Sequence, residues 1–239
     1  MGFLQRILRN SPNGNAADPY AAGSFETLSD DELRTHMGIK TYGAFELTDA
    51  IRPSYDLQIV PKQGFRKDKY VDEASGQTTP VVMAAASKER LLDLFFSLIQ
   101  PLGPVVDVVL ETSHRSEDSH EDLYREHIDL PVLESTLLEF EDVLLNDGCT
   151  GIAVINPNKK REVQFDEHKL LIAYGEETAE FEKILIQGDV YPDQDIRFIT
   201  EAEHVHSSSE RLYRSFGQMM TRLGMDSVST EGEDAAGAW

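Results

Sequence analysis

The feature that most constrains the fold is a run from Pro80 to Thr112, in which two short apolar segments flank a helix-like segment. Residues 80–86 and 104–111 are rich in valine and alanine, whereas residues 87–100 have the apolar spacing of a largely buried helix. Two short strands joined by such a helix are typical of a crossover unit with parallel strands. We therefore expect an α/β or α+β fold, with a mixed β-sheet that contains one βαβ crossover.

Other segments predict further strands and several packed amphipathic helices around this unit. Apolar and alternating segments predict strands at residues 56–60, 67–72, 78–85 and 196–199, and a three-strand meander at 150–155, 162–166 and 169–174. Capping signals and helical spacing predict helices that begin at Ser29 and Ser207 and helices over 132–146 and 176–187. The apolar faces predict a core of Phe95, Leu98, Val106, Val108, Leu137, Phe140, Phe181, Phe216 and Leu223.

The chain divides into a short N-terminal part, one globular α/β domain and a tail. We expect an amphipathic helix and flexible linker at 1–24, the domain at 25–224 and an acidic, disordered tail at 225–239. The N-terminal helix would bind a partner through Phe3, Leu4, Ile7 and Leu8. A helix this short is marginal alone, so docking on its own domain, disorder and membrane contact are the alternatives.

Charge and cysteine content exclude some functions and favour a location. The 43 acidic and 22 basic residues give a net charge of −21, which repels nucleic-acid backbones and anionic membrane surfaces. We therefore expect a protein partner and no nucleic acid. The single cysteine, Cys149, excludes an intrachain disulfide and fits the cytoplasm. No apolar stretch is long enough to span a membrane, and no secretory signal is present.

Familiar catalytic motifs are absent, and the best candidate site is the segment 111–127, which is rich in histidine and acidic residues. Glu111, His114, Asp118 and His120 are the candidate metal ligands, with Asp107 in a supporting role. These residues follow a predicted strand, where ligands often bind in open α/β sheets. A solvated polar surface segment is the alternative interpretation.

Other residues of suitable chemistry receive a structural interpretation. Cys149 follows the end of a predicted helix, where the local dipole opposes thiolate formation. His204 and His206 would share one face of a strand, but the flanking capping boxes favour helix starts and would point the two rings apart. Asp166 and His168 flank a predicted hairpin turn, where polar side chains are ordinary.

These observations support two hypotheses about function. The first is a non-catalytic, cytoplasmic interaction or regulatory protein with an acidic surface and no cofactor. The second is a metal-assisted hydrolase or general acid–base enzyme that uses the segment 111–127 with a divalent metal. The sequence leaves open whether the protein is an enzyme.

Overall fold

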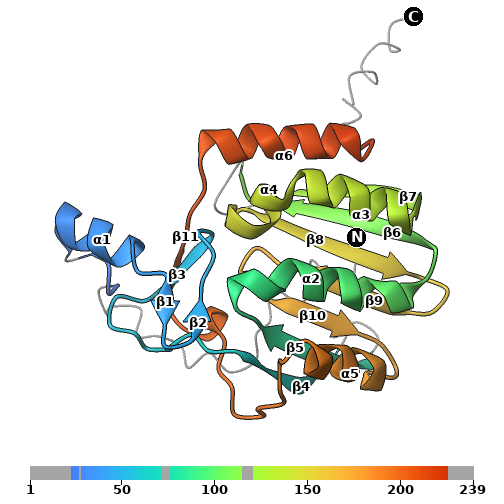
Figure 1. Cartoon of the computed structure of the whole chain (residues 1–239), viewed down its shortest axis with the longest axis horizontal. Coiled ribbons are helices and arrows are strands. Elements are labelled where there is room, and N and C mark those ends of the chain that lie inside the picture. Colours follow the sequence, from blue (N-terminus) through green and yellow to red (C-terminus); the bar gives the residue numbers. More distant parts are fainter. Residues whose placement is uncertain (1–22, 27, 72–75, 115–120, 226–239) are drawn as a thin grey trace, which may run out of the picture.

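A computed structural model describes residues 23–26, 28–71, 76–114 and 121–225 (Figure 1). Several residues for which the sequence predicts a role lie outside these ranges. Outside the described residues lie Phe3, Leu4, Ile7, Leu8, Asp118, His120 and the tail residues 226–239. The predictions for these residues stay predictions.

The central element is a seven-stranded antiparallel sheet with the strand order β4-β5-β10-β9-β8-β6-β7 (Figure 1). Its strands are β4 (Gly64–Val71), β5 (Thr78–Ala85), β6 (Val105–Thr112), β7 (Glu121–Asp129), β8 (Thr150–Asn156), β9 (Arg161–Phe165) and β10 (Leu171–Tyr174). Strands β8, β9 and β10 follow one another both in the chain and in the sheet. Strands β4 and β7 form the two edges.

The fold is α+β, and the predicted mixed sheet with parallel neighbours is wrong. Every pair of adjacent strands in this sheet is antiparallel among the described residues. Strands β5 and β6 do run in the same direction, and α2 (Lys88–Ile99) joins them. However, β10, β9 and β8 lie between them in the sheet. Apolar periodicity revealed the strand–helix–strand unit. It carries no information about which later strands of the chain insert between β5 and β6 in the sheet.

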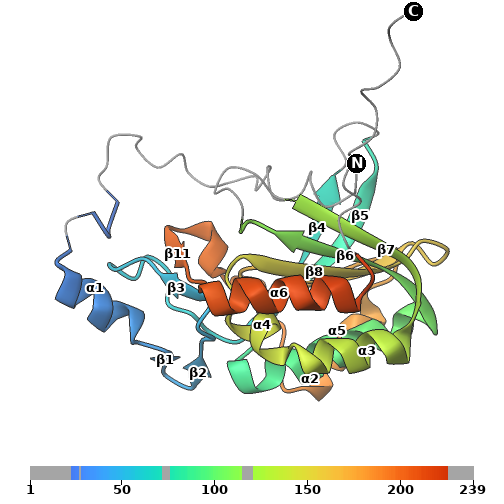
Figure 2. The ribbon, with the colours of Figure 1, turned by 90° about the horizontal axis from the view of Figure 1, so that it is seen from above.

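A layer of helices covers one face of the sheet (Figure 2). It consists of α2, α3 (Leu130–Glu139), α4 (Glu141–Asn146), α5 (Ala179–Gln187) and α6 (Glu210–Arg222). All the predicted core residues are buried here except Phe140, which packs against the core from a partly exposed position. Phe140 interrupts the predicted helix 132–146, because its backbone leaves the helical region between α3 and α4.

A smaller part of the molecule lies beside the main sheet (Figure 1). It contains α1 (Asp30–Met37), a two-stranded sheet of β1 (Thr41–Tyr42) and β2 (Phe45–Glu46), and a second of β3 (Ile51–Pro53) and β11 (His204–His206). The capping box predicted at Ser29 is present and opens α1. The strand predicted at 56–60 is absent from this described segment, which forms turns and bends instead.

Two other sequence predictions, for the start of α6 and for a strand at 196–199, differ from the structure. The N-cap of α6 is Ser209, whose hydroxyl accepts a hydrogen bond from the Leu212 amide, and not Ser207. The strand predicted at 196–199 is absent from the described segment, where a 3₁₀ turn, η3 (Ile199–Glu201), begins. In the described part of the chain, no helix has the length and apolar character needed to cross a membrane.

Candidate metal centre

His204 and His206 lie on strand β11, which corrects the prediction that helical spacing would point their rings apart. His204 pairs with Pro53 and His206 with Ile51 in the antiparallel register with β3. The Ser207 amide continues this pairing through a hydrogen bond to the Ala50 carbonyl. Because side chains alternate along a strand, the two imidazoles share one face.

The third histidine comes from the tight turn that joins β9 to β10. The Asp166 amide donates to the Leu170 carbonyl, and the Leu170 amide donates to the Asp166 carboxylate at 2.7 Å. Lys169 adopts a positive φ of 63°, which completes the reversal of the chain. This geometry carries His168 toward β11 at the end of the sheet.

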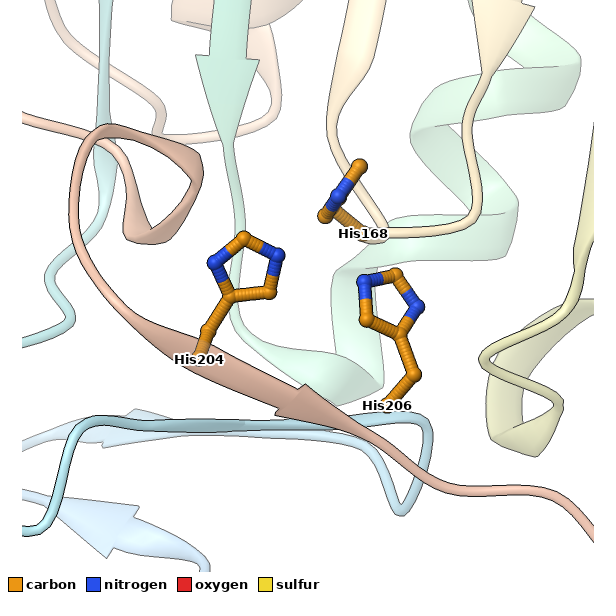
Figure 3. A group of neighbouring side chains, drawn as sticks. All are labelled: His168, His204 and His206. Atoms are coloured by element: carbon orange, nitrogen blue, oxygen red, sulfur yellow. The ribbon is translucent and has the colours of Figure 1, made fainter. Parts of the chain in front are cut away.

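The three imidazoles form a compact triangle (Figure 3). The ring centroids lie 5.0 Å apart for His168 and His204, 4.7 Å for His168 and His206, and 5.1 Å for His204 and His206. One ring nitrogen from each residue lies within 4.8 Å of the other two. Tetrahedral zinc needs nitrogens about 3.4 Å apart, given Zn–N bonds of about 2.0–2.1 Å. Small side-chain rotations therefore bring the three rings to coordinating distance.

Hydrogen bonds select the same free nitrogen in each ring. Nδ1 of His204 lies 2.8 Å from the Ala202 carbonyl, and Nδ1 of His206 lies 2.5 Å from the Gly148 carbonyl. Nδ1 of His168 lies 3.0 Å from the Asp166 carboxylate. Carbonyl and carboxylate oxygens can only accept, so each Nδ1 donates, and in the neutral form of each ring Nε2 keeps its lone pair. Histidines that bind metals usually have this second hydrogen bond to oxygen.

The surroundings shift the pKa values of the three rings in different directions. Burial alone would lower the pKa of His168, but the charge and hydrogen bond of Asp166 outweigh it and raise that pKa. Burial lowers the pKa of His204 and of His206, and the charge of His168 acts in the same direction on both. His204 and His206 therefore favour the neutral form that binds metals.

A second cluster joins His114 to Asp147 and Cys149. Nε2 of His114 lies 2.7 Å from the Asp147 carboxylate, which is fully buried and also accepts from the Thr150 hydroxyl at 2.7 Å. The Cys149 amide donates to the other oxygen of Asp147 at 3.2 Å. The His114 ring packs against Tyr213 and Phe216 of α6. Because these polar atoms already satisfy one another, the cluster is best explained as a structural link between β6, β8 and α6.

Cys149 is poorly suited to act as a nucleophile. Burial raises the pKa of its thiol, and the nearby charges of Asp147 and Glu167 raise it further. The thiolate, which is the reactive form, is therefore disfavoured near neutral pH. This agrees with the structural role expected for this residue.

Glu111 lies away from the helices, on the opposite face of the sheet. A Cβ atom on Gly151 of the neighbouring strand β8 would lie 3.1 Å from its carboxylate oxygen. Burial raises the pKa of Glu111 to about 8, and the charges of Asp122 and Asp166 contribute. Burial raises the pKa of Glu162 to about 7, although the Gln164 amide opposes this by donating to the carboxylate. Both acids keep their proton to a higher pH than an exposed glutamate does, and the protonated form is a poor metal ligand.

The described residues of the site predicted from the sequence, Asp107, Glu111 and His114, do not converge on one site. Nε2 of His114 is engaged by Asp147, whereas the Glu111 side chain lies over Gly151. Asp107 accepts a hydrogen bond from the His127 amide at 2.9 Å, beside the bulge where the register between β6 and β7 shifts. A metal role for Glu111, His114, Asp118 and His120 stays a prediction.

Sequence reasoning passed over the triad of His168, His204 and His206 although one signal was present. Two histidines separated by one residue share a face if the segment is a strand. The flanking serine and glutamate pairs resembled capping boxes and favoured helix starts instead. The contribution of His168 had no local signal, since it depends on how the β9–β10 turn meets β11.

Comparisons with protein-family models, with curated proteins and with solved structures find no match to this chain.

Proposed function

We propose that this protein binds one divalent transition-metal ion, with zinc as the first candidate, through Nε2 of His168, His204 and His206. The observation that carries the proposal is the matching set of Nδ1 hydrogen bonds, which leaves Nε2 free on three rings that each place a nitrogen within 4.8 Å of the other two. Three neutral imidazoles suit zinc, and also copper, nickel and cobalt, better than calcium or magnesium.

Each ligand has a support that comes from a different part of the chain. Asp166, only 5% exposed, orients His168, and backbone carbonyls orient the other two. The carbonyl that holds His206 belongs to Gly148, and the Gly148 amide donates to the Ser207 carbonyl just after β11. These contacts hold each of the three rings in its orientation before any ion binds. A preorganised ligand set lowers the entropic cost of binding.

The test is zinc titration of the untagged full chain by calorimetry, together with thermal unfolding. We expect one ion per chain, and an unfolding midpoint raised by roughly 5–10 °C at a free zinc concentration of 100 times Kd. His204→Ala and His206→Ala should each abolish the tight site. His127→Asn is the matched control, because it removes an exposed histidine at a positive φ of 57°, which asparagine tolerates.

Two results would refute the metal site. One is zinc binding by the His204→Ala and His206→Ala variants that equals binding by His127→Asn. The other is the absence of stoichiometric zinc in the wild-type protein. Metal-free unfolding of each variant shows whether it is folded, so that loss of binding is not confused with loss of structure.

The second proposal is the non-catalytic interaction or regulatory role in the cytoplasm. Its support is the net charge of −21, which favours a basic protein partner over nucleic acid. The N-terminal residues expected to contact a partner lie outside the described residues. A protein that fails the zinc test would leave this proposal as the preferred one.

A further inference from the structure

The coordination sphere of the triad is incomplete among the described residues. The group of metal-binding atoms that lie within 4.8 Å of one another contains the three histidines and no cysteine or carboxylate from this part of the chain. Structural zinc sites are usually closed by four protein ligands, whereas reactive sites use three and leave the fourth position to water. The triad, with three protein ligands, resembles the reactive sites.

The acidic side chains of the same turn have other partners. Both oxygens of Asp166 accept hydrogen bonds, one from His168 and one from the Leu170 amide. An oxygen of Glu167 accepts a hydrogen bond from the Ser113 hydroxyl at 3.0 Å. These bonds hold Asp166 behind the His168 ring and tie Glu167 to the end of β6. Neither carboxylate needs a metal ion to complete its contacts.

Solvent reaches the triad. His204 and His206 are partly exposed, and the His168 side chain is 11% exposed. A small ligand from solution can therefore approach an ion held by these rings.

Building on the metal site proposed above, we propose that the bound ion keeps an exchangeable fourth position that takes water or a small anion. Such a position distinguishes a reactive centre from a structural one. A water bound there loses a proton to solvent near neutral pH and becomes hydroxide, the nucleophile used in hydration and hydrolysis. The ligand class is thus water and small inorganic anions, with azide as a convenient probe.

The experiment uses the full chain loaded with cobalt(II), whose visible spectrum reports its ligands, and titrates it with sodium azide. We expect a saturable spectral change that corresponds to one azide per ion. Glu167→Gln should give the same cobalt spectrum and the same azide response, because Glu167 is not a ligand. Glu176→Gln, which changes an exposed glutamate after β10, is the matched control.

A cobalt spectrum that azide leaves unchanged would overturn the open position. A Glu167→Gln variant with an altered spectrum and a new response to azide would also overturn it, because Glu167 would then close the site. If the protein binds no cobalt at all, the metal site and the open position both fall. Cobalt binding without an azide response refutes only the open position.

Discussion

Replacing Glu111 with glutamine is expected to stabilise the protein in alkaline solution and to change its stability little in acid. Glutamine resembles the protonated carboxyl group in shape and carries no charge. In the folded protein, burial raises the pKa of Glu111 from 4.5 to about 8. The substitution therefore removes a charge that the folded state accommodates poorly.

The pKa of Glu111 fixes both the sign and the upper limit of this effect. Because the folded state binds the proton more tightly, the stabilising contribution of Glu111 is complete below pH 4.5 and is lost as the pH rises through about 8. The full shift corresponds to at most about 5 kcal/mol, at about 1.4 kcal/mol for each pKa unit. Glu162 titrates in the same region, and the Glu111 carboxyl keeps some contact with solvent. We therefore expect a measured gain of about 2 kcal/mol at about pH 9.

The assay is urea unfolding of wild type, Glu111→Gln and Glu46→Gln at a series of pH values from 5 to about 9. Wild type should lose stability as the pH rises, and Glu111→Gln should lose less. Some slope should remain in that variant, since the pKa of Glu162 is also raised, to about 7. Glu46 is exposed on β2, so its variant should follow wild type. A Glu111→Gln curve that parallels wild type across this range would refute the argument that Glu111 is buried as a neutral acid.

Two further predictions each compare two positions that differ in burial or in the space around them. Leu137 of α3 is fully buried and Leu138 beside it is 55% exposed, so Leu137→Ala should cost about 2–5 kcal/mol and Leu138→Ala less than about 0.5 kcal/mol in urea unfolding. Equal losses would show that α3 packs through another face. A Cβ on Gly148 would lie 2.3 Å from the Ala50 carbonyl oxygen, so Gly148→Ala should destabilise the protein by about 2–3 kcal/mol. Gly217 of α6 has open space around it, and Gly217→Ala should raise the thermal midpoint through a gain of about 0.5–1 kcal/mol. A Gly148→Ala protein as stable as wild type would contradict the close approach of the two segments.

The metal-site candidates show where local patterns stopped being informative. Glu111 and His114 were grouped because they are close in the chain and of suitable chemistry. In the structure, one lies over Gly151 on the sheet face away from the helices and the other is paired with Asp147. His168 and His204 are distant in the chain, yet their rings lie 5.0 Å apart. Convergence of this kind depends on contacts between elements, which residue spacing does not report.

The sequence by itself determined the features that depend on a few neighbouring residues. The capping box at Ser29 starts α1, and the apolar spacing of residues 87–100 locates α2 between two strands. Valine-rich residues 104–111 locate β6. These signals suffice because helix capping and side-chain periodicity act over one or two turns or strand positions.

Only the tertiary structure decided the sheet order, the break at Phe140 and the histidine triad. Three strands that come later in the chain lie between β5 and β6, so the crossover unit became part of an antiparallel sheet. Pairing of β11 with β3 turned His204 and His206 to one side, and the β9–β10 turn brought His168 to meet them. The physical reason is that strand pairing and burial depend on segments far apart in the chain, and they override local preferences that differ by only about 1 kcal/mol.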